Sequence, residues 1–269
     1  MQINEIFVVF DPTRKEQLAL DRAVNAARDL KAAIRLFACI YADVPRASRA
    51  QEIKQRVAAQ KQQLQEQVAD IEAESITVFV EVEWEENWYD AVIRAVLRHG
   101  SDVLFKTTHK HSATQRYLGK TSDWALIREC PCPVLLVKES ANWEHRKALA
   151  AIDIQADDEL HQRLNHSIVQ FTKDLLLPFD TEVHFINAYE DSMSFPDRSK
   201  LMQYCDTDTK YIHIDMGSPG DAILERAKSL DATVVVIGST GRSGISGLVR
   251  GNTAEKILDE LHCDLLLIP

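Results

Sequence analysis

The sequence predicts an α/β protein made of two tandem domains, each a doubly wound parallel sheet of the Rossmann-like kind. Apolar strands and helical patterns alternate with short connections, which is typical of parallel βαβ units. The pattern occurs twice, because the opening strand Ile6–Asp11 has a counterpart in Ala148–Asp153, and both end in an aspartate. The closing strands Pro133–Val137 and Asp264–Ile268 repeat in the same way. The chain is therefore an internal duplication.

The length of 269 residues fits two domains of ordinary size. We expect the first at residues 1–140 and the second at 145–269, joined by a short polar stretch. In each half the first strand leads into a long helix and then a second strand. The expected helices are Lys15–Lys31 and Asp157–Leu177, and the expected second strands are Ile34–Tyr41 and Glu182–Tyr189.

The two halves differ after the second strand. Aligning Ala188 with Cys39 gives an offset of 149, whereas aligning Asp221 with Asp90 gives 131, so the second half is about 18 residues shorter there. In the first half this stretch predicts a helix over Ala50–Ala73. In the second half, residues 190–210 are polar and show no sustained helical period. Either this helix is deleted or the sequence omits a mobile stretch.

Composition excludes several classes of function. An apolar content of 45% with 27% charged residues is typical of a globular protein. A net charge of −10 argues against binding of nucleic acid. We expect no membrane-spanning segment and no signal peptide. Five cysteines spread over two domains do not suggest a disulfide framework, so we expect a reduced, cytoplasmic protein.

A glycine-rich loop is the most informative functional feature. It runs from Gly238 to Thr253, between an apolar strand at Thr233–Ile237 and a helix expected at Ala254–Leu261, and holds five of the nine glycines. When a strand leads through a glycine-rich loop into a helix N-terminus, the accessible main-chain N–H groups of the loop can bind phosphate groups. Arg242 supplies a cation in the same loop.

The spacing of these glycines resembles the ATP-binding signature of the universal stress protein family, G-x2-G-x9-G. It is carried here by Gly238, Gly241 and Gly251, and the duplicated βαβ context resembles the tandem form of the family, closest to its E group. The resemblance covers both halves. It implies an adenine nucleotide bound by the second domain. Asn252 departs from the family pattern, which usually has Ser or Thr at that position.

The resemblance implies ATP, alone or with Mg²⁺, as the ligand, and it implies contacts from the strand ends and the glycine loop. The candidate binding residues are Ala151, Ile152, Asp153, Ala188, Ile237, Gly238, Ser239, Gly241, Arg242, Gly251, Asn252 and Thr253. Each also has an interpretation without a ligand. The stretch from Asn252 to Glu255 fits a helix cap, and an aspartate at a strand end often starts a turn.

The first half has lost the glycine motif. Thr107, Lys110 and Lys120 stand at the three glycine positions, and their side chains should block the approach to the backbone. We therefore predict that the first domain does not bind ATP in the manner of the family. We expect no metal at His109 and His111, or at the cysteine pair at 130 and 132, because further ligands at suitable spacing are missing.

Four aromatic residues gather in the first half, and we expect them to pack in the core or between domains, with an apolar ligand pocket as the alternative. They are Trp84, Trp88, Tyr89 and Trp124.

The function that best fits is a stress-response protein that holds an adenine nucleotide as a regulatory or assembly ligand. Its loop has no evident carboxylate pair for magnesium and no base, so we expect at most slow hydrolysis and no dedicated enzyme. The alternative is an interaction scaffold of the same fold. Family resemblance implies closing strands that pair, which would make the chain a pseudo-dimer. Beyond the nucleotide, we expect a protein partner or self-association, and neither nucleic acid nor membrane.

Overall fold

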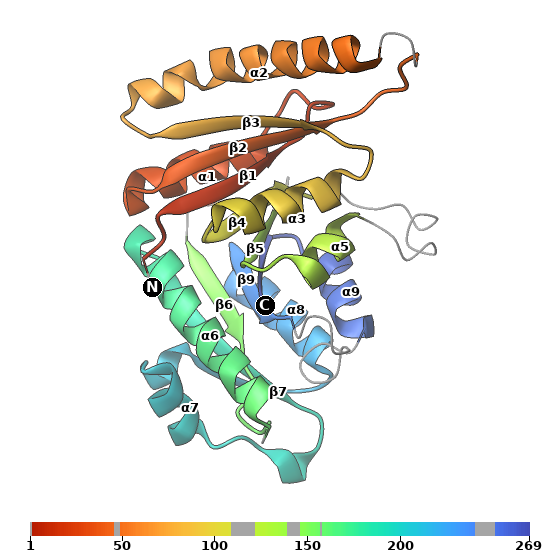
Figure 1. Ribbon diagram of the computed structural model, residues 1–269. Coiled ribbons are helices and arrows are strands. Elements are labelled where there is room, and N and C mark those ends of the chain that lie inside the picture. The colour runs from red at the N-terminus through yellow and green to blue at the C-terminus, as the bar shows by residue number, and fades with distance from the viewer. Residues whose placement is uncertain (1, 46–48, 109–121, 139–145, 157, 240–250) are drawn as a thin grey trace. The chain divides into compact units, whose positions relative to one another are not determined.

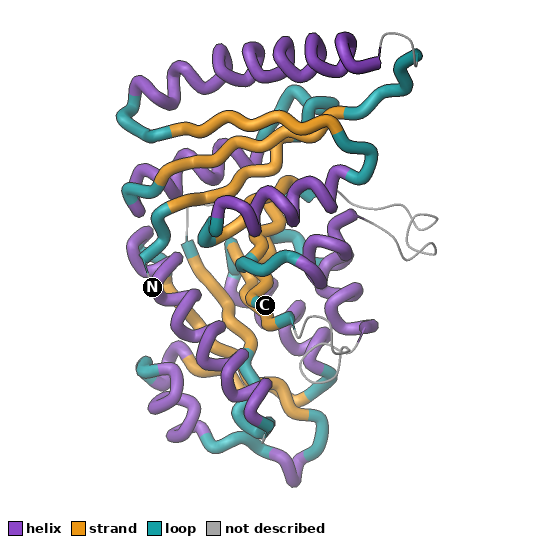
Figure 2. Tube along the Cα trace, viewed as in Figure 1, coloured by secondary structure: helices purple, strands orange, loops and turns teal. Residues whose placement is uncertain are grey.

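The computed structural model describes residues 2–45, 49–108, 122–138, 146–156, 158–239 and 251–269. The chain forms two compact units. The amino-terminal unit comprises Ile3–Thr107 and Cys130–Cys132, and the carboxy-terminal unit comprises Met1–Gln2, Thr108–Glu129 and Pro133–Pro269. The α/β fold class is confirmed in both (Figures 1 and 2).

The amino-terminal unit is a parallel sheet with the strand order β3-β2-β1-β4. Figure 1 shows α1 and α3 on opposite faces of this sheet and α2 lying along β3. The elements are β1 (Glu5–Phe10), α1 (Leu18–Leu30), β2 (Ala33–Ile40), α2 (Arg49–Ala73), β3 (Val78–Trp84), α3 (Trp88–His99) and β4 (Val103–Thr107).

The carboxy-terminal unit has the strand order β5-β10-β9-β6-β7-β8. Its neighbouring strands are parallel except for β5 and β10, which pair antiparallel. The elements up to β7 are α5 (Ser122–Glu129), β5 (Val134–Val137), β6 (Lys147–Ala151), α6 (Glu159–Leu176), η1 (Leu177–Phe179) and β7 (Glu182–Tyr189). Those that follow are η2 (Ser192–Ser194), α7 (Arg198–Cys205), η3 (Thr209–Tyr211), β8 (Ile212–Met216), α8 (Pro219–Leu230), β9 (Val234–Gly238), α9 (Gly251–Glu260) and β10 (Asp264–Ile268).

The helices form where apolar residues recur every three or four positions and a cap closes the end. In α1, the buried residues Ala19, Leu20, Ala23, Ala26 and Ala27 make one face. Asp158 caps the start of α6, because its carboxylate accepts a hydrogen bond from the main-chain N–H of His161 at 3.0 Å. The central strands β9 and β10 are buried along their whole length, as expected for strands covered on both faces.

The region from 190 to 210 differs from the sequence prediction. A helix is present there, α7, but it has 8 residues where α2 has 25. Asp197 caps it by accepting hydrogen bonds from the main-chain N–H groups of Ser199 and Lys200. Only two of its residues, Leu201 and Cys205, are buried, so its apolar repeat is too short to reveal a helix. The helix of the first half is therefore shortened here and not deleted.

The closing strands pair with each other inside the carboxy-terminal unit. Leu136 of β5 lies opposite Leu265 of β10, and Val134 lies opposite Leu267. Beside this ladder the main-chain N–H of Lys138 donates to the carboxylate of Asp264 at 2.8 Å. Burial lowers the pKa of the Lys138 side chain, whose Nζ donates to the carbonyl of Leu258. The facing edges of β5 and β10 thus pair with each other within one chain.

Among the described residues, none of the helices combines the length and hydropathy that crossing a bilayer would require. The five cysteines are all free thiols, and the sulfur atoms of Cys130 and Cys132 lie 3.6 Å apart.

Candidate functional site

The ends of three neighbouring strands of the carboxy-terminal unit bring the candidate residues together. β6 pairs with β7 on one side and with β9 on the other, all parallel, so their carboxyl ends meet at one edge of the sheet (Figure 1). Asp153, Ala188 and Ser239 are half-buried at this edge. Ala151, Ile152, Ile237 and Gly238 lie beneath them in the core. Ligands of open parallel sheets bind at this kind of edge.

Two buried asparagines hold the backbone of this edge. The side chain of Asn165 accepts from the main-chain N–H of Asp153 at 3.1 Å and donates to its carbonyl at 2.6 Å. Asn187 accepts from the N–H of Ile154 at 3.1 Å and donates to the carbonyl of Ala188 at 3.0 Å. Their exposed fractions are 2% and 0%. The strand end is therefore fixed by side-chain amides.

These two asparagines are not among the binding residues that the sequence predicts. Both could have been noticed because each is an amide side chain where the pattern calls for an apolar one. Asn187 lies in an apolar strand, and Asn165 lies on the inner face of a helix. A buried amide has to be hydrogen-bonded, so such a position predicts a partner in the backbone nearby.

Asp153 forms the turn that follows β6. Its Oδ1 accepts from the main-chain N–H of Gln155 at 3.0 Å, which is an Asx-turn. The Gln155 side chain in turn donates to the carbonyl of Ser194. The segment around η2 is thereby tied to the site, with Phe195 packing edge-on against Tyr189 at a centroid distance of 5.3 Å. Phe195 remains 57% exposed, so an aromatic ring stands at the rim.

Gly238 is required by packing. A Cβ at this position would lie 2.5 Å from Cδ2, 2.7 Å from Cγ and 3.0 Å from Cδ1 of Leu164. Leu164 projects from α6 and is buried. The close approach of α6 to β9 thus gives Gly238 a packing reason, beside its predicted role of leaving room for a nucleotide.

Ser239 uses its polar groups within the protein. Its main-chain N–H donates to the carbonyl of Ile268 at 2.6 Å, and its hydroxyl donates to the carbonyl of Ile127 at 3.2 Å. Gly241 and Arg242 lie outside the described residues.

The helix after the glycine loop begins earlier than expected. α9 starts at Gly251, whereas the sequence indicated Ala254, so Gly251, Asn252 and Thr253 form its first turn. The backbone N–H groups of a first turn have no acceptor within the helix. An anion placed there would therefore meet free donors and the positive end of the helix dipole.

The first repeat has a different arrangement at the same edge. Gln17 accepts from the N–H of Asp11 at 3.1 Å and donates to its carbonyl at 2.8 Å, the role that Asn165 has in the second repeat. Thr107 stands at the position of Gly238, and its hydroxyl accepts from the main-chain N–H of Ala19 in the first turn of α1 at 3.0 Å. Lys110 and Lys120 lie outside the described residues.

The aromatic residues of the first repeat form separate pairs. Trp84 packs with Tyr41, with ring centroids 5.9 Å apart. Trp88 packs edge-on against Tyr89 at 6.2 Å, and the Lys106 ammonium lies 5.3 Å from the Trp88 ring. The side chain of Trp124 is outside the described residues. Tyr41, the partner of Trp84, was not in the predicted aromatic group.

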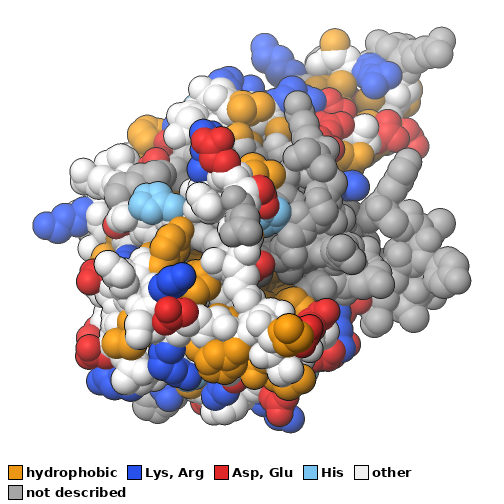
Figure 3. All heavy atoms as spheres, turned by 90° about the horizontal axis from the view of Figure 1, so that it is seen from below, with side chains coloured by type: hydrophobic (Ala, Val, Ile, Leu, Met, Phe, Trp, Pro, Cys, Tyr) orange, Lys and Arg blue, Asp and Glu red, His pale blue; other side chains and the backbone are white. Residues whose placement is uncertain are grey.

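Charged groups interleave on the surface of the described residues. Figure 3 shows lysine and arginine side chains dispersed among acidic and hydrophobic ones on the face that it presents. No cluster of three or more His, Cys, Asp or Glu side chains that could hold a metal occurs within the part of the chain that the structure describes.

Comparison with known proteins identifies the family. Residues 3–138 and 199–269 match the Universal stress protein family. Universal stress protein E of Escherichia coli (strain K12) is 30% identical over 299 residues, which covers 98% of this chain and 93% of that protein. A universal stress protein E homolog of Haemophilus influenzae is 26% identical and covers 99% of this chain and 97% of that one.

Solved structures agree with this result. A crystal structure assigned to the universal stress proteins, from Pseudomonas aeruginosa UCBPP-PA14, superimposes with a TM-score of 0.77 at 27% identity, covering 99% of this chain and 93% of that one. A universal stress protein from Archaeoglobus fulgidus has a TM-score of 0.73 at 16% identity, covers 98% and 96%, and shows the shared fold. With its two α/β repeats, the chain belongs to the universal stress protein family.

Proposed function

We propose that the chain is a cytoplasmic stress-response protein whose second repeat holds an adenine nucleotide as a regulatory or assembly ligand. The observation that carries this is the single sheet edge at which Asp153, Ala188 and Gly238 lie at the carboxyl ends of three adjacent strands. ATP, alone or with Mg²⁺, is the ligand that family membership favours.

Each end of the nucleotide has candidate partners. The half-buried carboxylate of Asp153 has one oxygen in its own turn, and Oδ2 can accept from a ribose hydroxyl. The exposed ring of Phe195 offers a stacking surface for a base at the rim. The first turn of α9 offers main-chain N–H groups to phosphate oxygens. Gly251 to Thr253 would then lie at the phosphate end.

The direct test is equilibrium titration of the full chain with labelled ATP, ADP and AMP. We expect saturable binding, weakened by about 10- to 150-fold in Asp153→Ala, because a hydrogen bond to a charged group contributes about 1.5–3 kcal/mol. Gly251→Val should abolish binding of the triphosphate. The matched control is Asp11→Ala in the first repeat, which should leave binding unchanged. Circular dichroism checks that each variant folds.

Hydrolysis should be slow or absent. Among the described residues, Asp153 has one carboxylate oxygen in its own turn and its other oxygen assigned to the ribose, and the Ser239 hydroxyl donates to a main-chain carbonyl, so neither is arranged as a base. Phosphate release during prolonged incubation with ATP measures this. Rapid turnover would contradict the proposal and indicate an enzyme.

A second candidate is an interaction scaffold of the same fold, with a protein partner or a second copy as its ligand. It is favoured because several polar groups of the edge are already paired internally, including both main-chain groups of Asp153 and the carbonyl of Ala188. Absence of binding at millimolar nucleotide, with a folded protein, would decide for this scaffold.

A further inference from the structure

The amino-terminal half of α2 stands away from the sheet. Of the 25 residues of this helix, Leu64 and Val68 are buried, and both lie in its carboxy-terminal half. Earlier in the helix the apolar residues Ile53 and Val57 are only half-buried, and Ala59, Gln60 and Gln63 line the space beside the strands. A cavity of about 300 Å³ remains between the helix and the ends of β2 and β3. This volume is at the lower end of small-molecule sites.

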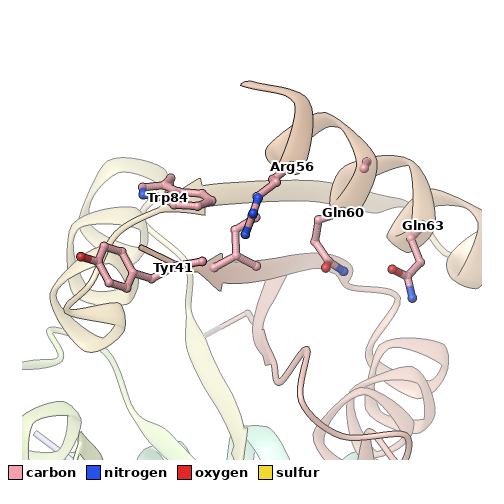
Figure 4. Close-up of a pocket in the computed structure, with 8 residues that line it drawn as sticks. Tyr41, Arg56, Gln60, Gln63 and Trp84 are labelled. Carbon is pink, nitrogen blue, oxygen red and sulfur yellow. The ribbon is translucent and has the colours of Figure 1, made fainter. Parts of the chain in front are cut away.

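The cavity has an aromatic wall and a polar wall (Figure 4). Tyr41 and Trp84, at the ends of β2 and β3, form the aromatic wall, with ring planes inclined by 52°. Arg56, Gln60 and Gln63 project from α2 toward the strands in Figure 4. A flat ring could pack on the first wall while its polar edge meets the second.

The charges around the cavity balance. The guanidinium of Arg56 is paired with the Glu52 carboxylate at 2.5 Å. On the strand side, the negative charge of Glu86, together with burial and Asp43, raises the pKa of Tyr41, and the positive charge of Arg49 acts against this rise. An anionic ligand would therefore meet Glu86 and Asp43, and a cationic ligand would meet Arg56. A neutral ligand avoids both costs.

The polar side chains of the cavity can both donate hydrogen bonds to a ligand and accept them from it. The amides of Gln60 and Gln63 each offer a donor and an acceptor. The indole Nε1 of Trp84 is buried and has no hydrogen-bond acceptor among the described residues. In Figure 4 this nitrogen is on the side of the ring turned away from Arg56. The Trp84 donor therefore faces away from the polar wall, and the hydrogen bonds to a ligand would come from Gln60 and Gln63.

We propose that this cavity is a binding site for a small, neutral, planar molecule, namely a heteroaromatic ring that carries an amide-like group. The site belongs to the first repeat, because the helix that forms its wall is reduced to the 8 residues of α7 in the second. It is also separate from the proposed nucleotide site. Cys39, the counterpart of Ala188, is not among its lining residues. Its test is accordingly independent of nucleotide binding.

The experiment uses the full chain with ¹⁵N-labelled tryptophan and two probes of equal size, neutral indole-3-acetamide and anionic indole-3-acetate. The Nε1–H signal of Trp84 is assigned from its loss in Trp84→Phe. We expect this signal to shift saturably with the acetamide, and the acetate to bind at least about tenfold more weakly. Hydrogen exchange of the main chain in residues 49–60 should slow when the acetamide is bound.

Two variants of α2 distinguish binding in the cavity from nonspecific binding to the surface of the helix. Gln60→Leu should weaken acetamide binding severalfold. Gln62→Leu is the matched control, because Gln62 hydrogen bonds to Glu66 at 3.1 Å and does not line the cavity. The proposal is overturned by equal or stronger binding of the acetate, by equal weakening in both variants, or by no shift at millimolar acetamide and nicotinamide.

Discussion

The two repeats end their equivalent strands, β4 and β9, in opposite ways. β4 ends in Thr107, whose hydroxyl caps the first turn of α1. β9 ends in Gly238, which has no side chain, and Leu164 of α6 occupies the space where a Cβ would stand. A polar contact thus connects helix and strand in the first repeat, and apolar packing does so in the second. The loss of a glycine is therefore a change in packing as well as a predicted change in ligand access.

The strongest test of this comparison is Gly238→Ala. We expect the variant to lose about 2–3 kcal/mol of unfolding free energy, because its Cβ would overlap the buried Leu164 side chain. Leu164→Ala is destabilising alone. The variant that combines it with Gly238→Ala should lose less unfolding free energy than the two single losses added together, as direct contact between the two residues requires. Urea unfolding of the full chain measures this. Additive effects would contradict a packing role for Gly238.

The second test compares the two amides that hold the strand-end aspartates. Asn165→Leu should cost about 2 kcal/mol, because Asn165 is buried and its two hydrogen bonds to Asp153 cannot be replaced by water. Gln17→Leu should cost less than about 1 kcal/mol, because Gln17 is half-buried and water can reach Asp11. Equal costs in urea unfolding would show that burial does not distinguish the repeats.

Much of the fold could be predicted because strands and long helices carry strong local patterns. The bounds expected for Glu182–Tyr189 and Asp264–Ile268 match β7 and β10, since polar residues flank each apolar run. The close approach of Gly238 to Leu164 could not be predicted, because it depends on how α6 crosses the sheet. The cavity beside Trp84 depends likewise on a helix half that fails to pack. Such tertiary distances leave no periodic signal in the sequence.

The pH dependence should differ between the repeats. Within the second, His184 Nδ1 and His213 Nε2 are 2.9 Å apart. Burial, with smaller effects from Arg226 and His184, lowers the pKa of His213 to about 4. The unfolded chain then binds more protons between about pH 6.5 and 4, so stability falls as the pH drops through this window. We expect a loss of about 1 kcal/mol, discounted because His213 is only half-buried.

The first repeat has the Arg35–Glu5 ion pair at 2.8 Å at the position equivalent to His184. Burial would raise the pKa of Glu5, but Arg35 and Ser101 lower it, so that stability is lost only below about pH 4.5. Urea unfolding at several pH values, with amide exchange of β8 as a local readout, should show the loss of stability between about pH 6.5 and 4. It should disappear in His213→Gln and persist in His166→Gln, an exposed control.

The smallest expected effect concerns the cap that replaces the glycine in the first repeat. Thr107→Val keeps the shape of the side chain and removes the acceptor for the N–H of Ala19, so it should cost about 0.5–1 kcal/mol. Ser192→Ala is a suitable surface control, since its side chain is exposed. Faster amide exchange at Ala19, confined to the first turn of α1, would identify the cap as the cause. If Thr107→Val leaves this exchange unchanged, the hydroxyl does not hold α1, and the polar contact proposed for the first repeat has to be abandoned.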